Sequence, residues 1–135
     1  MYNVQCAMYN VQCAMYNVQC AISCNRGWES LKKVRITVMR QTVYEDLMAQ
    51  YENPIEHACT MQVGQVFVAN GWQKPADLCD SAWDSMSAFV MTLAHGGEDI
   101  YSGWMKNKRS AMISCNDGFR PVSFLIETLD EEAGQ

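Results

Sequence analysis

Apolar and polar residues alternate along residues 33–40, which places Val34, Ile36 and Val38 on one face and polar side chains on the other. A period of two is the pattern of a strand that buries one face and exposes the other. A second short apolar stretch, residues 65–69, ends at an Asn-Gly pair that favours a turn. The pattern therefore predicts two strands in the first half of the body of the chain.

Two further apolar runs, residues 111–115 and 122–129, flank Asn116-Asp117-Gly118. Because Asn and Gly reach the left-handed backbone region at little cost, this order predicts a β-hairpin closed by a short turn that contains the glycine. Cys115 ends the first run, where the chain turns. The residues of the second run that share the apolar face are Val122, Phe124 and Ile126.

Helical spacing marks two other segments. Thr42 and Glu45 have the spacing of a capping box, which predicts a short helix that ends before Asn53-Pro54. A longer helix begins at a cap formed by Asp80 or Ser81 and ends at Gly96-Gly97. Its apolar stripe, which we interpret as core, consists of Trp83, Met86, Phe89, Val90 and Leu93.

The order strand, helix, strand, helix, hairpin predicts an α+β fold. We expect a small, mainly antiparallel sheet with two helices on one face. At 135 residues, of which 49% are hydrophobic, the chain suits one globular domain with a core of useful size. We place this domain at residues 31–135, after an N-terminal extension at residues 1–30.

The extension opens with the heptapeptide MYNVQCA three times without a change. A recent tandem duplication or a cloning artefact accounts for such identity as well as a function does. If the segment is ordered, its period of seven places Met and Val at the a and d positions of a three-heptad helix. A strand is the alternative, but an odd period exchanges its two faces at every repeat, so a helix is favoured.

The net charge of -5 is modestly acidic. Lys106, Lys108 and Arg109 form one short basic cluster beside a turn, which reads as a solvated loop, so we expect no nucleic-acid partner. No apolar run reaches the roughly 20 residues of a membrane span. The first residues lack the basic start and apolar core of a secretory signal, and we expect a cytoplasmic protein.

Seven cysteines are an odd number, so complete internal pairing is impossible, and a reducing compartment would leave thiols free. No Cys-x-x-Cys occurs, so any metal site has to combine distant segments. His57 and Cys59 stand two residues apart in a loop. Such a pair can coordinate a metal or act as base and nucleophile, although an incidental pair is the commoner case.

From residue 32 to about residue 129 the chain resembles a family of short, uncharacterised prokaryotic proteins typical of anaerobes. The resemblance rests on Cys79-x-x-Ala82-Trp83 and Cys115-x-Asp117-Gly118-x-Arg120-Pro121-Val122, together with KKVRITV at the start and Gly96-Gly97. It implies no activity. It does imply that Cys59, Cys79 and Cys115 matter, because these three fall on family positions, whereas Cys24 and the cysteines of the repeat do not.

Each of these three cysteines lies at the end of a predicted element, so the fold can bring them to one edge of the sheet. Three thiolates, with His57, would suit zinc or an iron–sulfur cluster, or would support thiol-redox chemistry. The alternative is that each cysteine is a small buried hydrophobe. A function of a different class is a non-catalytic binding or assembly module, in which the repeat mediates self-association or contact with another protein. The chain has no Gly-x-Ser-x-Gly, phosphate loop or His-Glu-x-x-His that would identify catalytic residues.

Overall fold

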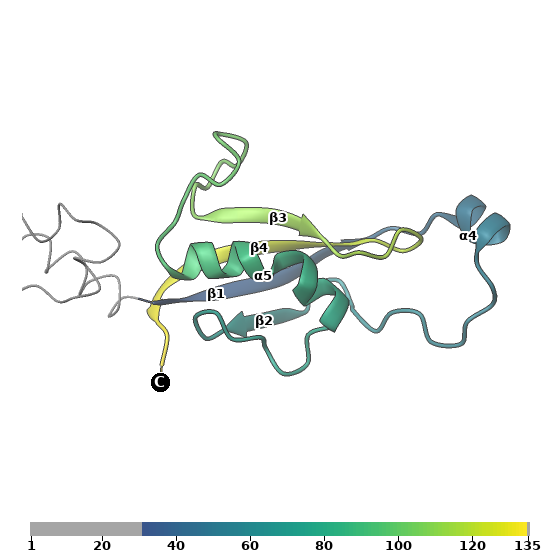
Figure 1. The fold of residues 1–135 in the computed structure, drawn as a ribbon, viewed down its shortest axis with the longest axis horizontal. Coiled ribbons are helices and arrows are strands. Elements are labelled where there is room, and N and C mark those ends of the chain that lie inside the picture. Colours follow the sequence, from purple (N-terminus) through teal and green to yellow (C-terminus); the bar gives the residue numbers. More distant parts are fainter. Residues whose placement is uncertain (1–30, 135) are drawn as a thin grey trace, which may run out of the picture. The chain divides into compact units, whose positions relative to one another are not determined.

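The structure is a computed structural model that describes residues 31–134. The chain divides into two units, and the second, Lys32–Gln135, contains every element described below. The heptad helix predicted for the N-terminal extension lies outside the described residues. The elements of the second unit, in chain order, are β1 (Lys32–Gln41), α4 (Glu45–Tyr51), β2 (Val66–Ala69), α5 (Asp80–Ala94), β3 (Ser110–Ser114) and β4 (Val122–Glu132) (Figure 1).

The strands form one antiparallel sheet in the order β2-β1-β4-β3, so the predicted α+β class is confirmed. The two longest strands, β1 and β4, lie side by side at the centre. Their register sets Ile36 opposite Ile126, and Ile36 also faces Phe67 of β2. Because paired residues of neighbouring strands share a face, the apolar positions of the strands form one continuous surface.

Helix α5 covers this apolar surface of the sheet (Figure 1). Met86, Val90 and Leu93 of its predicted stripe are fully buried, whereas Trp83 and Phe89 are only half-buried. In the first turn of the helix the buried residue is Ala82 and not the larger Trp83. The sheet residues that the alternation predicted to be core are all at most 1% exposed: Val34, Ile36, Val38, Val122, Phe124 and Ile126.

Helix α4 differs from the prediction in its cap and in its position. Tyr44 occupies the N-cap and no side chain caps the helix, so the predicted capping box is wrong. None of its residues is buried, and it lies beyond the end of the sheet rather than on the face that α5 covers (Figure 1). The backbone N–H groups of Thr42 and Tyr44 donate to Pro121 O (3.0 Å) and Phe119 O (2.9 Å). Because these hydrogen bonds pair the chain after β1 with the hairpin loop, α4 begins past the end of the sheet.

The β3–β4 hairpin is confirmed, but its connection is longer than the predicted short turn. Cys115 N–H donates to Val122 O at 3.0 Å, so residues 116–121 form the loop between the strands. Gly118 does not adopt a positive φ. Instead, the Asp117 carboxylate accepts the backbone N–H groups of Phe119 (2.8 Å) and Arg120 (3.0 Å), which is the way an Asp side chain shapes a turn.

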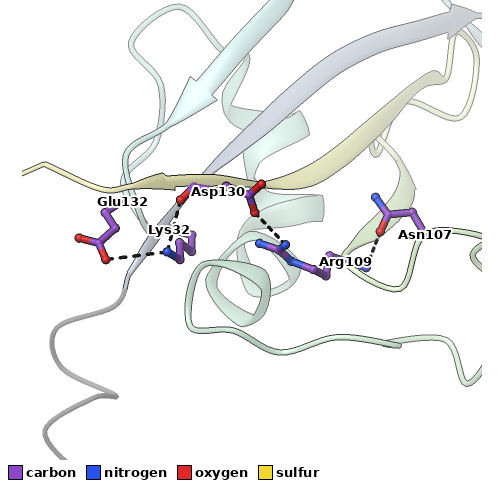
Figure 2. Close-up of polar contacts among 5 residues, drawn as sticks. All are labelled: Lys32, Asn107, Arg109, Asp130 and Glu132. Carbon is purple, nitrogen blue, oxygen red and sulfur yellow. Dashed lines mark hydrogen bonds and ion pairs between the residues drawn. The ribbon is translucent and has the colours of Figure 1, made fainter.

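Ion pairs lie at the end of the sheet where β1 begins and β4 ends, opposite the end near α4 (Figure 2). Lys32 contacts Glu132 at 3.8 Å, and Arg109 contacts Asp130 at 3.0 Å. The Arg109 backbone N–H also donates to Asn107 Oδ1 at 3.0 Å. Exposed pairs of this kind each contribute little to stability. Arg109 of the basic cluster thus links the start of β3 to β4 through an exposed ion pair.

Candidate thiol site

The three cysteines singled out in the sequence line one cavity of about 210 Å³. The cavity lies where three segments meet: the loop before β2, which carries Cys59, the start of α5, which carries Cys79, and the loop after β3, which carries Cys115. Its apolar wall includes Met61, Ala82, Val122 and Phe124, and its polar wall includes Ser81, Asp117 and Arg120. The fold therefore brings together thiols that are far apart in the sequence.

Cys79 is the exposed member of the three and occupies the N-cap position of α5. The predicted cap by Asp80 or Ser81 is wrong, because α5 has no side-chain cap. Asp80 instead forms an ion pair with Lys74 at 2.8 Å. The hydrogen bond from Lys74, helped by its charge, lowers the pKa of Asp80. The carboxylate next to Cys79 is therefore ionised near neutral pH, and the lysine offsets its charge.

Cys115 is half-buried and held by the backbone of β4. Its Sγ accepts a hydrogen bond from Val122 N–H at 3.3 Å. The next residue, Asn116, donates its side-chain amide to Ser81 O at 3.3 Å. This bond ties the loop that carries Cys115 to the first turn of α5, which begins directly after Cys79.

Cys59 is half-buried and lines the cavity, as Arg120 does. The Arg120 side chain is only 12% exposed and forms a two-pronged ion pair with Glu52, one hydrogen bond of which joins Nη1 to Oε2 at 3.0 Å. The hydrogen bond to Glu52 raises the pKa of Arg120; burial opposes this rise, and the negative charges of Glu52 and Asp117 add to it. A guanidinium paired with Glu52 therefore forms part of the wall of the cavity that Cys59 also lines.

His57, the fourth predicted ligand, lies outside the cavity. Its side chain is exposed and does not line the cavity. Among residues 31–134, no three His, Cys, Asp or Glu side chains are arranged to hold a metal ion. The metal set of Cys59, Cys79, Cys115 and His57 stays a prediction, and the geometry described here is that of a thiol cavity.

The sequence did not reveal the ion pair between Arg120 and Glu52. The Asp117 carboxylate, although close in sequence, binds the backbone N–H of Arg120, whereas the Arg120 guanidinium contacts Glu52. These partners are 68 residues apart, and no local pattern connects them. The sequence placed Arg120 only in the segment between the two strands of the hairpin.

Comparisons with known protein families, with curated proteins and with solved structures found no match. The resemblance to short prokaryotic proteins stays a prediction. Neither helix in the described part of the chain offers the long apolar run that a membrane span requires.

Proposed function

We propose that this protein is a thiol-redox protein whose reactive groups are the cysteines of the cavity. The single observation that carries this proposal is that Cys59, Cys79 and Cys115 all line one cavity of about 210 Å³. The predicted family resemblance singles out the same three residues. A reducing compartment such as the cytoplasm, which we propose as its location, keeps such thiols available for exchange.

The different exposures of the three thiols give them different roles. Cys79 is exposed and lies at the start of a 15-residue helix, so we assign it as the thiol that attacks a substrate. Cys115 is half-buried on the facing loop, which Asn116 ties to the same helix turn, so we assign it as the resolving thiol.

The substrate class that suits this arrangement is a disulfide. The Cys79 thiolate attacks one sulfur of the substrate disulfide, a mixed disulfide forms, and the other substrate sulfur leaves as a thiolate. The Cys115 thiolate then attacks Cys79 Sγ in the mixed disulfide, and the second substrate sulfur leaves. The substrate has gained two electrons, and the protein now holds a Cys79–Cys115 disulfide.

Arg120 has a positioning role in this proposal. Both prongs of its guanidinium contact Glu52, so it is not available to bind a second carboxylate in the same way. Its ion pair joins the end of α4 to the hairpin loop and thereby fixes the wall of the cavity near Cys59. We infer that Cys59 lines the site without taking part in the exchange.

Metal binding by the same thiols is the second candidate function. The observation that favours it is again the gathering of three cysteines, since zinc and iron–sulfur clusters are commonly bound by thiolates. Side-chain movement would have to complete the ligand set, because no such set is assembled within the described residues.

The experiment uses the full chain with Cys6, Cys13, Cys20 and Cys24 replaced by serine, so that only the cysteines of the cavity remain. The protein is equilibrated in glutathione buffers of graded redox potential, alkylated, digested and analysed by mass spectrometry. We expect one intramolecular disulfide, between Cys79 and Cys115, and a free thiol at Cys59. Cys115→Ser should leave Cys79 as a mixed disulfide with glutathione.

Cys59→Ser is the matched control and should leave the Cys79–Cys115 disulfide intact. The redox proposal is wrong if three independent mixed disulfides form at every potential and no internal bond appears. Metal analysis of the same protein, purified without oxygen, decides between the two candidates. Stoichiometric zinc or iron that is lost in Cys59→Ser would favour the metal site.

A further inference from the structure

Helix α4 presents apolar side chains to solvent. No residue of this helix is buried. Tyr44, Leu47 and Tyr51 recur at helical spacing, so they lie on one side of it, and Tyr51 is 68% exposed. Met48 and Ile55 line an adjoining open groove of about 620 Å³. We call Tyr44, Leu47, Met48, Tyr51 and Ile55 the α4 surface.

The unpaired charges around the α4 surface are negative, since Arg120, which also lines the groove, is paired with Glu52. Residues 41–73 contain no Lys or Arg, and their carboxylates are Glu45, Asp46, Glu52 and Glu56. Glu52 is neutralised by Arg120. The other three form no ion pair with any residue of the described part. A partner that fits this surface therefore carries an apolar or aromatic group flanked by cations.

A loop elsewhere in the same chain carries those groups. Residues 99–108, here called the Trp104 loop, expose Trp104 to 82%, the highest value among the large hydrophobic side chains of the described residues. Lys106 and Lys108 follow it, are exposed, and form no ion pair within residues 31–134. Inside the loop, the Tyr101 ring lies between Phe89 and Trp104, with centroids at 5.9 and 5.5 Å.

The Trp104 loop is held in one conformation by its own hydrogen bonds. The Asp99 carboxylate accepts Gly103 N–H at 2.7 Å, and Asp99 N–H donates to Lys108 O at 2.7 Å. Asp99 and Ser102 adopt positive φ values of 56° and 50°, which residues other than glycine rarely do. A tryptophan held outward by a strained, hydrogen-bonded loop is a preorganised anchor, because little freedom is lost when it binds.

The α4 surface and the Trp104 loop lie at opposite ends of strand β3. The loop leads into Ser110, where β3 begins, whereas α4 is bonded to Phe119 in the hairpin loop, beyond the end of β3 at Ser114. Figure 1 shows the Trp104 loop near one end of the sheet and α4 beyond the other end. The two surfaces therefore cannot meet within one molecule.

We propose that the α4 surface of one molecule binds the Trp104 loop of a second molecule. Trp104 packs against the apolar side of α4, and Lys106 and Lys108 face Glu45 and Glu56. The contact joins two different surfaces, so it is head-to-tail and extends to rings or chains. Because one aromatic anchor and a few exposed charges carry it, the association is weak and sensitive to salt.

Sedimentation velocity of the full chain, in the presence of a reductant, tests the proposal. We expect the sedimentation coefficient to rise with protein concentration at about 0.05 M salt and to rise less at about 0.5 M salt. Trp104→Ala should weaken the association at least about tenfold, as loss of a central aromatic anchor does. The double variant Leu47→Ala/Tyr51→Ala should weaken it comparably, because it removes the receiving surface while retaining good helix formers.

Two controls separate this contact from other causes. Trp72→Ala, which removes another exposed tryptophan (53% exposed), should leave association unchanged. Lys106→Glu/Lys108→Glu, which alters only exposed side chains, should weaken association at low salt without any effect on the fold.

Mixing provides the decisive measurement. The Trp104→Ala protein keeps a working α4 surface, and the Leu47→Ala/Tyr51→Ala protein keeps a working loop, so an equimolar mixture should form a one-to-one dimer that grows no further. The proposal is overturned if the wild-type chain stays monomeric at all concentrations. It is also overturned if either variant associates like the wild type, or if the mixture forms no dimer.

Discussion

Replacing Met86 by alanine tests whether α5 is the element that closes the core. The Met86 side chain is 0% exposed and lies between Ala82 and Val90, buried residues on the same side of the helix. The core residues of the sheet that α5 covers, such as Ile36 and Phe124, are also 0% exposed, and a close-packed core refills such a space only in part. We expect Met86→Ala to lower the free energy of unfolding by about 2–5 kcal/mol, as buried methionine-to-alanine changes do.

The assay is urea unfolding of the full chain, followed by circular dichroism and by tryptophan fluorescence. The midpoint should fall while the slope m stays constant, because the surface exposed on unfolding changes little. Thermal unfolding should agree, since 1 kcal/mol corresponds to about 4–8 °C in Tm for a domain of 60–100 residues.

Met91→Ala is the matched control. It makes the same substitution on the same helix, but Met91 is 48% exposed. We expect a change within about 0.5 kcal/mol, because surface substitutions away from special features have small effects. If the two variants lose similar stability, or if Met86→Ala loses none, then α5 does not cover the sheet as described.

Two further predictions concern local features. Gly97→Ala should lower the free energy of unfolding by about 1–3 kcal/mol, because the added Cβ would lie 2.5 Å from Thr92 Cγ2 and 2.9 Å from Thr92 O. Gly118→Ala, whose Cβ would meet no atom within 4 Å, should leave the free energy of unfolding unchanged. Urea titration compares the two variants. Lys74→Met removes the partner that lowers the pKa of Asp80. A carboxyl group whose pKa is lowered by folding stabilises the fold at pH values above its ordinary pKa of 3.8, and this stabilisation is lost as the pH falls through the folded-state pKa. The variant should therefore be slightly less stable than wild type at neutral pH, and the difference should shrink as the pH falls below 3.8. Thermal unfolding across this range measures the difference, and a difference independent of pH would contradict the assignment.

The alternation of apolar and polar residues was sufficient to predict the central strands and their buried faces. Val34, Ile36 and Val38 of β1 are buried as expected, because a period of two assigns each side chain to one face of a strand whatever its neighbours are. Helix α5 was predicted from the helical spacing of its apolar residues and from the glycines that follow it, and Gly96 has a φ of +90° just after the helix ends. Information of this kind is contained in a short window of sequence.

The capping box of α4 and the short hairpin turn were wrong because other contacts replaced local preferences. The backbone N–H of Tyr44 is bonded to the hairpin loop, and no side chain caps α4. In that loop, the Asp117 carboxylate shapes the chain without a glycine in the left-handed region. A local sequence pattern identifies residues that can form a motif. Whether they form it depends on which other hydrogen-bond partners the folded chain offers them.

The sequence by itself determined which residues form the strands, the long helix and the core, and it indicated three cysteines at the ends of those elements. Only the tertiary structure decided that Cys59, Cys79 and Cys115 share a cavity, that His57 lies outside it and that Glu52 holds Arg120. The physical reason is that periodicity acts over a few neighbouring residues. The meeting of side chains that are tens of residues apart depends on strand register and on the path of the connecting loops, which only the packed chain defines.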